Sequence, residues 1–245
     1  MAAVGYEQRR IRTIRSTWII LVVTLVLAGA IAALLGGLSN LDPETGERLG
    51  QASLRDVLTA AVNPIVLVPV SVLAAMAFGG EYRFGLIRQT LTTFPGRTKV
   101  FLAKLWVVVL WMLAFLILAT AVVVGVAYLF RSNVDVDPLA TENITYALRA
   151  LAFGVLYGLF TFALVVITRN QALSIVIVIL WTVVLESLLV GLLGDRFEWL
   201  PDVLPMTAGA AFVTGDDMAR NAAVFVGVLA VLLLAGWGLF VKRDA

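Results

Sequence analysis

Two residue types are missing from this 245-residue chain, which contains no cysteine and no histidine. The lack of cysteine excludes disulfides, thiolate-bound iron–sulfur clusters and thiol nucleophiles. The lack of histidine removes a common zinc ligand and the side chain that most often transfers protons near neutral pH. The sequence therefore argues against an intramembrane metalloprotease or a serine–histidine enzyme.

Charged residues are also scarce. Only 14% of the chain is Asp, Glu, Lys or Arg, below the quarter or so that is usual in soluble domains, while 61% is hydrophobic and the mean hydropathy is +1.00. A helix needs about 20 apolar residues to cross a bilayer core of about 30 Å. The sequence therefore predicts an all-α polytopic membrane protein, one transmembrane domain over 1–245. Its six predicted spans are 18–38, 57–78, 101–130, 145–168, 172–193 and 221–241.

The basic residues are unevenly distributed between the loops on the two sides of these spans. Twelve of the eighteen Lys and Arg fall in the N-terminal segment, in residues 79–104, at Arg169 and at the C-terminus. Twelve of the sixteen acids fall in the loops of the other side. Because basic residues favour the cytoplasmic side, we expect a multi-pass protein of the cell membrane with both termini in the cytoplasm.

Residues 79–99 form an unusually polar stretch between two long apolar runs. Their apolar residues recur at helical spacing, which predicts an amphipathic helix over 81–94. We expect Gly79-Gly80 to let the chain turn out of the second span, and Pro95-Gly96 to end the helix. The predicted apolar stripe consists of Phe84, Ile87, Leu91 and Phe94. Such a helix either lies on anionic lipid or docks on a cytoplasmic partner.

The run EYRFGLIRQTLTTFPGRTKVFLAK, from Glu81 to Lys104, resembles the segment after the second span in permease subunits of type-2 ATP-binding-cassette (ABC) exporters. The family pattern is matched at Glu81, Arg83, Gly85, Pro95, Arg97 and Lys104. Leu86 departs from it, because it occupies the usual Thr position. The number of spans and the chain length also resemble this family. The basic segment from Tyr6 to Thr17 resembles the family's connecting helix, although a plain positive-inside anchor explains the same arginines.

The resemblance implies that the stretch is a coupling helix seated on a separate ATPase subunit. The chain has no G-x-x-x-x-G-K-[ST] loop of its own, so ATP and Mg would be bound by that partner, and this chain would bind no cofactor or metal. Glu81 is expected to pair with a base of the partner, or with Arg83 or Arg88 of its own helix; ordinary local capping is the alternative. The implied contact residues are Glu81, Tyr82, Arg83, Phe84, Gly85, Ile87, Arg88, Leu91 and Phe94.

Two polar features lie inside the predicted spans. Glu186 is the one unambiguous ionisable residue within a span and should face protein or water rather than lipid. It lines a substrate pathway, pairs with an arginine of an outer loop, or is protonated and hydrogen-bonded within the bundle. Asn63, followed by Pro64 and with Pro69 nearby, predicts a kink in the second span, where polar groups relieve the freed backbone.

Two further patterns concern packing. Ala150, Gly154 and Gly158 form a stripe of small residues that permits close helix approach, which we assign to packing within the chain rather than to a dimer seam. The prolines at 201 and 205 predict two broken short helices before the last span. By resemblance these would be re-entrant helices that cap the exit, and an irregular surface loop is the alternative.

The sequence as a whole predicts the membrane subunit of an exporter that moves an amphipathic or lipid-like substrate outward by alternating access. The partners would be the ATPase, a second copy or homologous permease, and membrane lipid, without nucleic acid. The alternatives are a non-transporting scaffold or signalling subunit and an intramembrane enzyme. The enzyme would need a carboxylate pair or a Ser–Lys site, and Glu186 has no second carboxylate beside it in a span.

Overall fold

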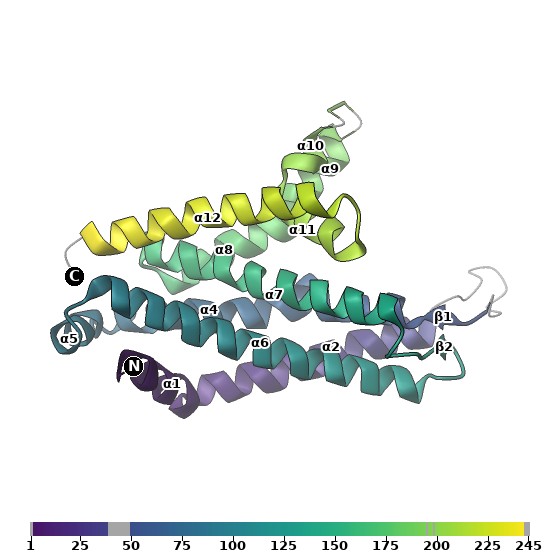
Figure 1. Ribbon diagram of the computed structural model, residues 1–245, viewed down its shortest axis with the longest axis horizontal. Helices are drawn as coiled ribbons and strands as arrows, with labels where there is room; N and C mark the ends of the chain where they lie inside the picture. Colours follow the sequence, from purple (N-terminus) through teal and green to yellow (C-terminus); the bar gives the residue numbers. More distant parts are fainter. Residues whose placement is uncertain (1, 39–49, 195, 198, 243–245) are drawn as a thin grey trace.

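The computed structural model describes residues 2–38, 50–194, 196–197 and 199–242, and in these ranges the protein is a bundle of long helices (Figure 1). Six of the helices are long and apolar enough to cross a membrane, which confirms the predicted number of spans and the all-α class. Some of the charged loop residues counted above lie outside the described residues, namely Arg48, Arg243 and the acids at 42, 44, 47, 195, 198 and 244. The six spans are Arg15–Leu38, Leu54–Arg83, Arg97–Leu129, Thr141–Thr168, Gln171–Leu193 and Met218–Lys242.

Four spans are single helices and two are composite. The single ones are α2 (Arg15–Leu38), α6 (Arg97–Leu129), α7 (Thr141–Thr168) and α12 (Met218–Lys242). The second span joins α3 (Leu54–Leu58), a 3₁₀ turn η1 (Thr59–Val62) and α4 (Pro64–Arg83), and the fifth joins α8 (Gln171–Ile179), a π-helical segment η2 (Leu180–Leu185) and α9 (Glu186–Leu193). The short elements are α1 (Ala2–Thr13), α5 (Ile87–Thr93), α10 (Leu200–Val203), α11 (Pro205–Thr214), β1 (Ala52–Ser53) and β2 (Val134–Asp135).

The bundle has two distinct ends (Figure 1). We call one the α5 end: it carries α1, α5, the turn between α7 and α8, and the last turn of α12. We call the other the β end, where β1 and β2 pair in parallel and α10 and α11 precede α12. Among the described residues, the bases of the larger predicted group gather at the α5 end and those of the smaller group toward the β end. The two sets of loops are therefore separated in space as the charge pattern requires.

The fourth span, α7, is the centre of the bundle and is packed on by α4, α6, α8, α11 and α12. Its small residues allow this, because a side chain at Gly154 would meet Leu116 and Leu67, and one at Gly158 would meet Met112. The stripe of small residues therefore serves packing within the chain, as predicted. Toward the α5 end, rings from four spans pack together: Phe78, Phe101, Phe162 and Phe240.

The predicted kink in the second span is present at Asn63. The residue before a proline avoids the helical region, and Asn63 is extended (ψ 134°) between η1 and α4. Its side chain accepts a hydrogen bond from the backbone N–H of Ile65 at 3.0 Å, so it caps the new helix that Pro64 begins. Pro69 lies inside α4, which continues through it.

The predicted helix over 81–94 is wrong in its boundaries, and so is the predicted turn at Gly79-Gly80. α4 runs through both glycines to Arg83, and the chain turns at Gly85, whose φ is +67°. The N–H of Leu86 donates a hydrogen bond to Glu81 O at 2.9 Å, and the N–H of Gly85 donates one to Tyr82 O at 3.4 Å. These are the two hydrogen bonds of a Schellman motif, with glycine in the left-handed position. α5 begins only at Ile87 and ends before Pro95, where the end was predicted.

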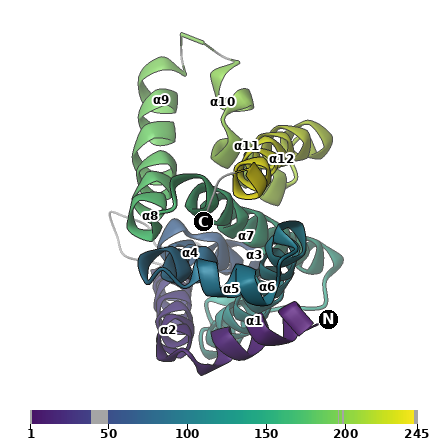
Figure 2. The ribbon, with the colours of Figure 1, turned by 90° about the vertical axis from the view of Figure 1, so that its left-hand side faces the viewer.

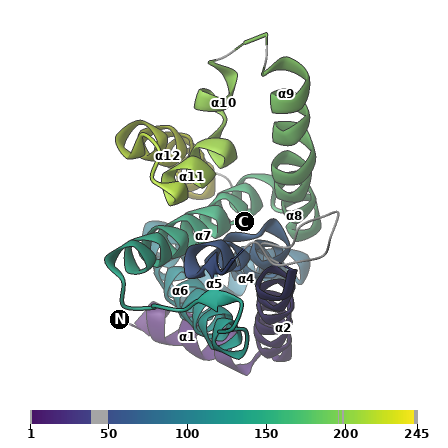
Figure 3. The same ribbon diagram turned by 90° about the vertical axis from the view of Figure 1, so that its right-hand side faces the viewer.

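The fifth span departs from the others. α8 packs on α4 and α7, but α9 leans away from the bundle beside α10 (Figures 2 and 3). This is the least buried of the six spans, and its outer face is lined by large apolar side chains such as Leu180, Val184, Leu188 and Leu192. The two short helices predicted before the last span are present as α10 and α11, which meet at Leu204.

Candidate functional site

Four charged side chains meet inside the protein at the α5 end, and we call them the ionic cluster: Glu7, Arg10, Glu81 and Lys104. They come from α1, α4 and α6, three helices that are far apart in the sequence. Lys104 Nζ lies 2.6 Å from Glu7 Oε1 and 2.6 Å from Glu81 Oε1. Arg10 forms an ion pair with Glu81, and its Nη2 lies 3.2 Å from Glu7 Oε2. The cluster therefore ties α1 to the end of the second span and the start of the third.

The ionic cluster is removed from solvent. Lys104 is fully buried and Glu81 is 2% exposed. A buried charge is costly unless it is paired and hydrogen-bonded, and here two acids face two bases. The backbone carbonyl of Ala77 accepts further bonds from Lys104 Nζ at 3.1 Å and from Arg10 Nη2 at 2.6 Å. The ammonium of Lys104 also lies 5.2 Å from the centroid of the Phe78 ring.

The position of Glu81 corrects the prediction of its partners. Glu81 lies in the last turn of α4 and pairs with Arg10 and Lys104, whereas Arg83 and Arg88 are exposed. The reason is the side chain's direction: Glu81 points into the bundle, while the two arginines follow it on the outer side of the chain's turn. The sequence contained one signal for this arrangement, since Lys104 lies eight residues into α6, a place where a base needs a partner.

The predicted apolar stripe does not form one exposed face. Ile87 is buried, and Leu91 and Phe94 pack against the core of the same chain, with the Phe94 ring 6.0 Å from that of Tyr6 in α1. Phe84, in contrast, is 68% exposed at the turn, next to exposed Leu86. The turn at Gly85 changes the phase of the helix, so the two ends of the stripe face in different directions. The apolar surface that remains available is at the turn, not along α5.

Tyr82 and Arg169 connect this end of α4 to the turn between α7 and α8. The Tyr82 ring stacks on Phe78 with centroids 5.9 Å apart, and the Arg169 guanidinium carbon lies 5.6 Å from the Tyr82 centroid. Gly79 makes a close approach on the same side, because a Cβ there would lie 2.5 Å from Gln171 Cβ. α4 and α8 are thus in direct contact next to the ionic cluster.

Glu186 forms a second buried polar centre, toward the β end. Its Oε1 accepts hydrogen bonds from Trp181 Nε1 at 2.6 Å and from the N–H of Met206 at 3.0 Å. Its Oε2 accepts from the N–H of Thr207 at 2.7 Å and from Thr207 Oγ1 at 2.8 Å. Met206 and Thr207 open α11, whose N-cap residue, Leu204, has no side chain able to cap. Glu186 therefore caps α11 from another helix.

The π-helical segment explains how Trp181 and Glu186 meet. They are five residues apart and would lie on different faces of an α-helix, whereas the i→i+5 pattern of a π-helix brings such residues together. Of the alternatives predicted for Glu186, hydrogen bonding within the bundle is therefore present, and all four contacts are donors to its carboxyl oxygens.

Glu186 also borders a cavity of about 490 Å³ between the second, fourth and fifth spans. The buried hydroxyl of Tyr157, which has no hydrogen-bond partner in the described part of the chain, lines this cavity too. Asn63 borders a neighbouring cavity of about 550 Å³, and the two cavities share Pro64, Thr182 and Ser187. The two predicted intramembrane polar residues thus lie on adjacent cavities. Across the described ranges, no group of three or more acidic side chains is placed to hold a metal ion.

Comparison with known proteins assigns the chain to a protein family. Residues 44–245 match the model of a family described as a protein of unknown function, DUF2705. Because the match covers most of the chain, the protein belongs to this family. No curated protein matches the chain.

Proposed function

We propose that the protein is the permease subunit of an ATP-driven exporter of the type-2 ABC class. In this proposal it lies in the plasma membrane, and its α5 end faces the cytoplasm. The observation that carries the proposal is the ionic cluster at the root of the α4–α5 turn. A short element that transmits force from a soluble motor must be fixed to the spans it moves. Here the turn is fixed to α1, α4 and α6 at once by Glu7, Arg10, Glu81 and Lys104.

In this proposal the ATPase subunit contacts exposed side chains of the turn, Phe84 and Leu86, and Arg88 at the start of α5. Because Glu81 is buried, it belongs to the ionic cluster that transmits the movement and not to the surface that contacts the ATPase. ATP and Mg are bound by the partner. Movement of the turn would be passed through the cluster to the first three spans, and through the close contact of Gly79 with Gln171 to the fifth.

The transport pathway in this proposal requires a second copy of this chain or a homologous permease. The large apolar face of the fifth span is available for lipid or for such a partner. Glu186 acts as a structural cap that holds α11 beside α7 and α12, and α10 with α11 forms the re-entrant cover of the exit. The substrate would be amphipathic or lipid-like, consistent with the mainly apolar lining of the cavities beside Asn63 and Glu186.

The test is co-expression with candidate ABC ATPase subunits and purification of the complex. We expect Phe84→Asp combined with Leu86→Asp to abolish both co-purification and ATPase stimulation, because it places two charges in the proposed contact. The matched control is Leu139→Asp, which changes a still more exposed leucine in a loop at the β end. A native complex with normal ATPase stimulation in the Phe84/Leu86 variant would overturn the proposal, and the scaffold alternative would then be favoured.

An intramembrane enzyme is the weaker candidate. Its carboxylate would have to be Glu186, but both oxygens of that residue are occupied by donors from Trp181, Met206 and Thr207. A general base needs a free lone pair within reach of the proton it takes. Ser187, which lines the same cavity, has no lysine beside it among the lining residues.

A further inference from the structure

A groove of about 650 Å³ runs along the first and second spans at the α5 end. This volume lies within the range of about 300–1,000 Å³ that is usual for small-molecule sites. The walls come from the end of α1, the start of α2 and the last turns of α4, and Gln171 of α8 closes one side. The groove is separate from the cavities beside Glu186, with which it shares no lining residue.

The lining of the groove changes from apolar to polar along its length. Ile19, Ile20, Val72 and Met76, which belong to the membrane-spanning parts of α2 and α4, supply an aliphatic floor. The polar side chains lie at the ends of the spans: Ser16, Arg83 and Gln171. This is the order in which a membrane lipid presents its acyl chain and its headgroup.

The Arg83 guanidinium gives the polar end of the groove a positive charge that is not paired with an acid in the described ranges. Arg83 makes no hydrogen bond or ion pair with any residue in the described ranges, and its guanidinium carbon lies only against the Phe84 ring, 5.5 Å from the centroid. The other charges in the lining, Arg10 and Glu81, neutralise each other within the ionic cluster. Arg83 therefore gives this end a net positive charge and N–H donors without an acceptor.

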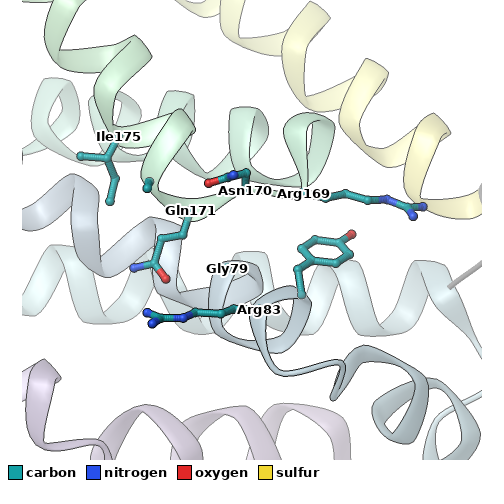
Figure 4. Close-up of a pocket in the computed structure, with 8 residues that line it drawn as sticks. Gly79, Arg83, Arg169, Asn170, Gln171 and Ile175 are labelled. Atoms are coloured by element: carbon teal, nitrogen blue, oxygen red, sulfur yellow. The ribbon is translucent and has the colours of Figure 1, made fainter.

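A second cavity, of about 500 Å³, lies on the other side of the same helix end and shares Arg83 and Gln171 with the groove. Figure 4 shows the Arg83 and Gln171 side chains reaching toward the same side, whereas Arg169 extends in the opposite direction. Among the described residues, no acid lines this cavity. Arg83 and Gln171 thus place hydrogen-bond donors between the groove and the second cavity, and Arg169 adds a second guanidinium to the lining of that cavity.

We propose that the groove binds an anionic phospholipid of the surrounding membrane, with its phosphodiester at Arg83, Gln171 and Ser16 and an acyl chain along Val72 and Met76. Every polar group assigned to the headgroup can donate a hydrogen bond, as a phosphodiester requires, and the guanidinium matches the geometry of phosphate oxygens. The lipid would bridge the first, second and fifth spans. The proposal goes beyond transport by the chain, because it requires neither an ATPase partner nor a moving substrate.

The experiment is native mass spectrometry of the purified chain in mild detergent, titrated with phosphatidylglycerol and with phosphatidylcholine of the same acyl chains. We expect phosphatidylglycerol to bind about fivefold more tightly, the gain typical of one base near an anionic headgroup. Arg83→Gln should abolish this preference. The matched control Arg88→Gln removes the same charge from an exposed position outside the groove and should retain the preference.

The apolar half of the proposal is tested separately by Val72→Trp, which fills the floor and should weaken binding of both lipids; Met76→Trp serves if the first variant does not fold. Glycerol 3-phosphate and inorganic phosphate, which have no acyl chain, are used as competitors and should not displace the lipid. Displacement by either would show a site for soluble phosphate and overturn the proposal. Equal loss in Arg83→Gln and Arg88→Gln, or unchanged binding after the groove is filled, would also overturn it.

Discussion

Two buried glutamates, one toward each end of the bundle, are stabilised in opposite ways. Glu81 is 2% exposed and is neutralised by full charges, Arg10 and Lys104, from two other helices. Glu186 is 3% exposed and, within the described part of the chain, contacts no base, only the N–H and O–H groups of Trp181, Met206 and Thr207. A carboxyl group inside an apolar protein can therefore be stabilised by ion pairs or by dipoles that are already oriented. Substitutions of the two kinds of partner should have different effects on stability.

The largest effect is expected from Lys104→Met, which leaves Glu7 and Glu81 buried with Arg10 as their single base. Removing one partner of a buried ion pair costs about 3–5 kcal/mol in the free energy of unfolding. The measurement is denaturation of the purified protein in detergent micelles. Lys99→Met is the matched control, because Lys99 is exposed on the same helix, and we expect it to change stability by no more than about 0.5 kcal/mol. Similar losses in both variants would contradict the role assigned to the ionic cluster.

The second effect is expected from Glu186→Gln, which keeps the shape of the side chain but replaces one acceptor oxygen by an NH₂ group. One pair of donors, either Trp181 with Met206 or Thr207 alone, would then lose its acceptor. An unsatisfied buried donor costs about 1–3 kcal/mol. The measurement is hydrogen exchange, which should accelerate at the Met206 and Thr207 amides without a change in α1.

Glu142→Gln is the control for the Glu186 variant, since Glu142 is exposed at the start of α7. It should leave the hydrogen-exchange rates of the α11 amides at the values of the unsubstituted protein. If Glu186→Gln also left α11 unchanged, the cap would contribute nothing to that helix, and the two glutamates would differ less than their contacts indicate.

Much of the fold could be predicted because it depends on local patterns. The length of each apolar run determined the number of spans, and Asn63 before Pro64 predicted the break in the second span. The predicted helix over 81–94 is wrong in its boundaries because periodicity alone does not show where a helix ends. Gly85 is one of four glycines in residues 79–99, and the φ of +67° that ends α4 there accompanies the Schellman hydrogen bonds of Leu86 and Gly85.

Apart from Trp181, the partners of both glutamates could not be predicted, because they come from more distant parts of the chain. Lys104 lies 97 residues from Glu7 in the sequence, and Thr207 lies 21 from Glu186. Charge type and burial indicate that each carboxylate needs a partner, but only the packing of the helices selects it. The same limit applies to the apolar stripe of α5, since the sequence shows its period and not whether Ile87 faces a partner or its own bundle.

The smallest effect is expected where an ion pair is exposed. Arg220 and Asp202 form an ion pair between α12 and α10 toward the β end, and each side chain is 45% exposed. Exposed pairs contribute about 0–1 kcal/mol because water solvates both charges and salt screens them. Arg220→Gln should therefore lower the free energy of unfolding by less than about 1 kcal/mol, and raising the ionic strength should reduce that difference in the same denaturation assay. A loss as large as that of Lys104→Met would show that burial is not what separates the ionic cluster from this pair.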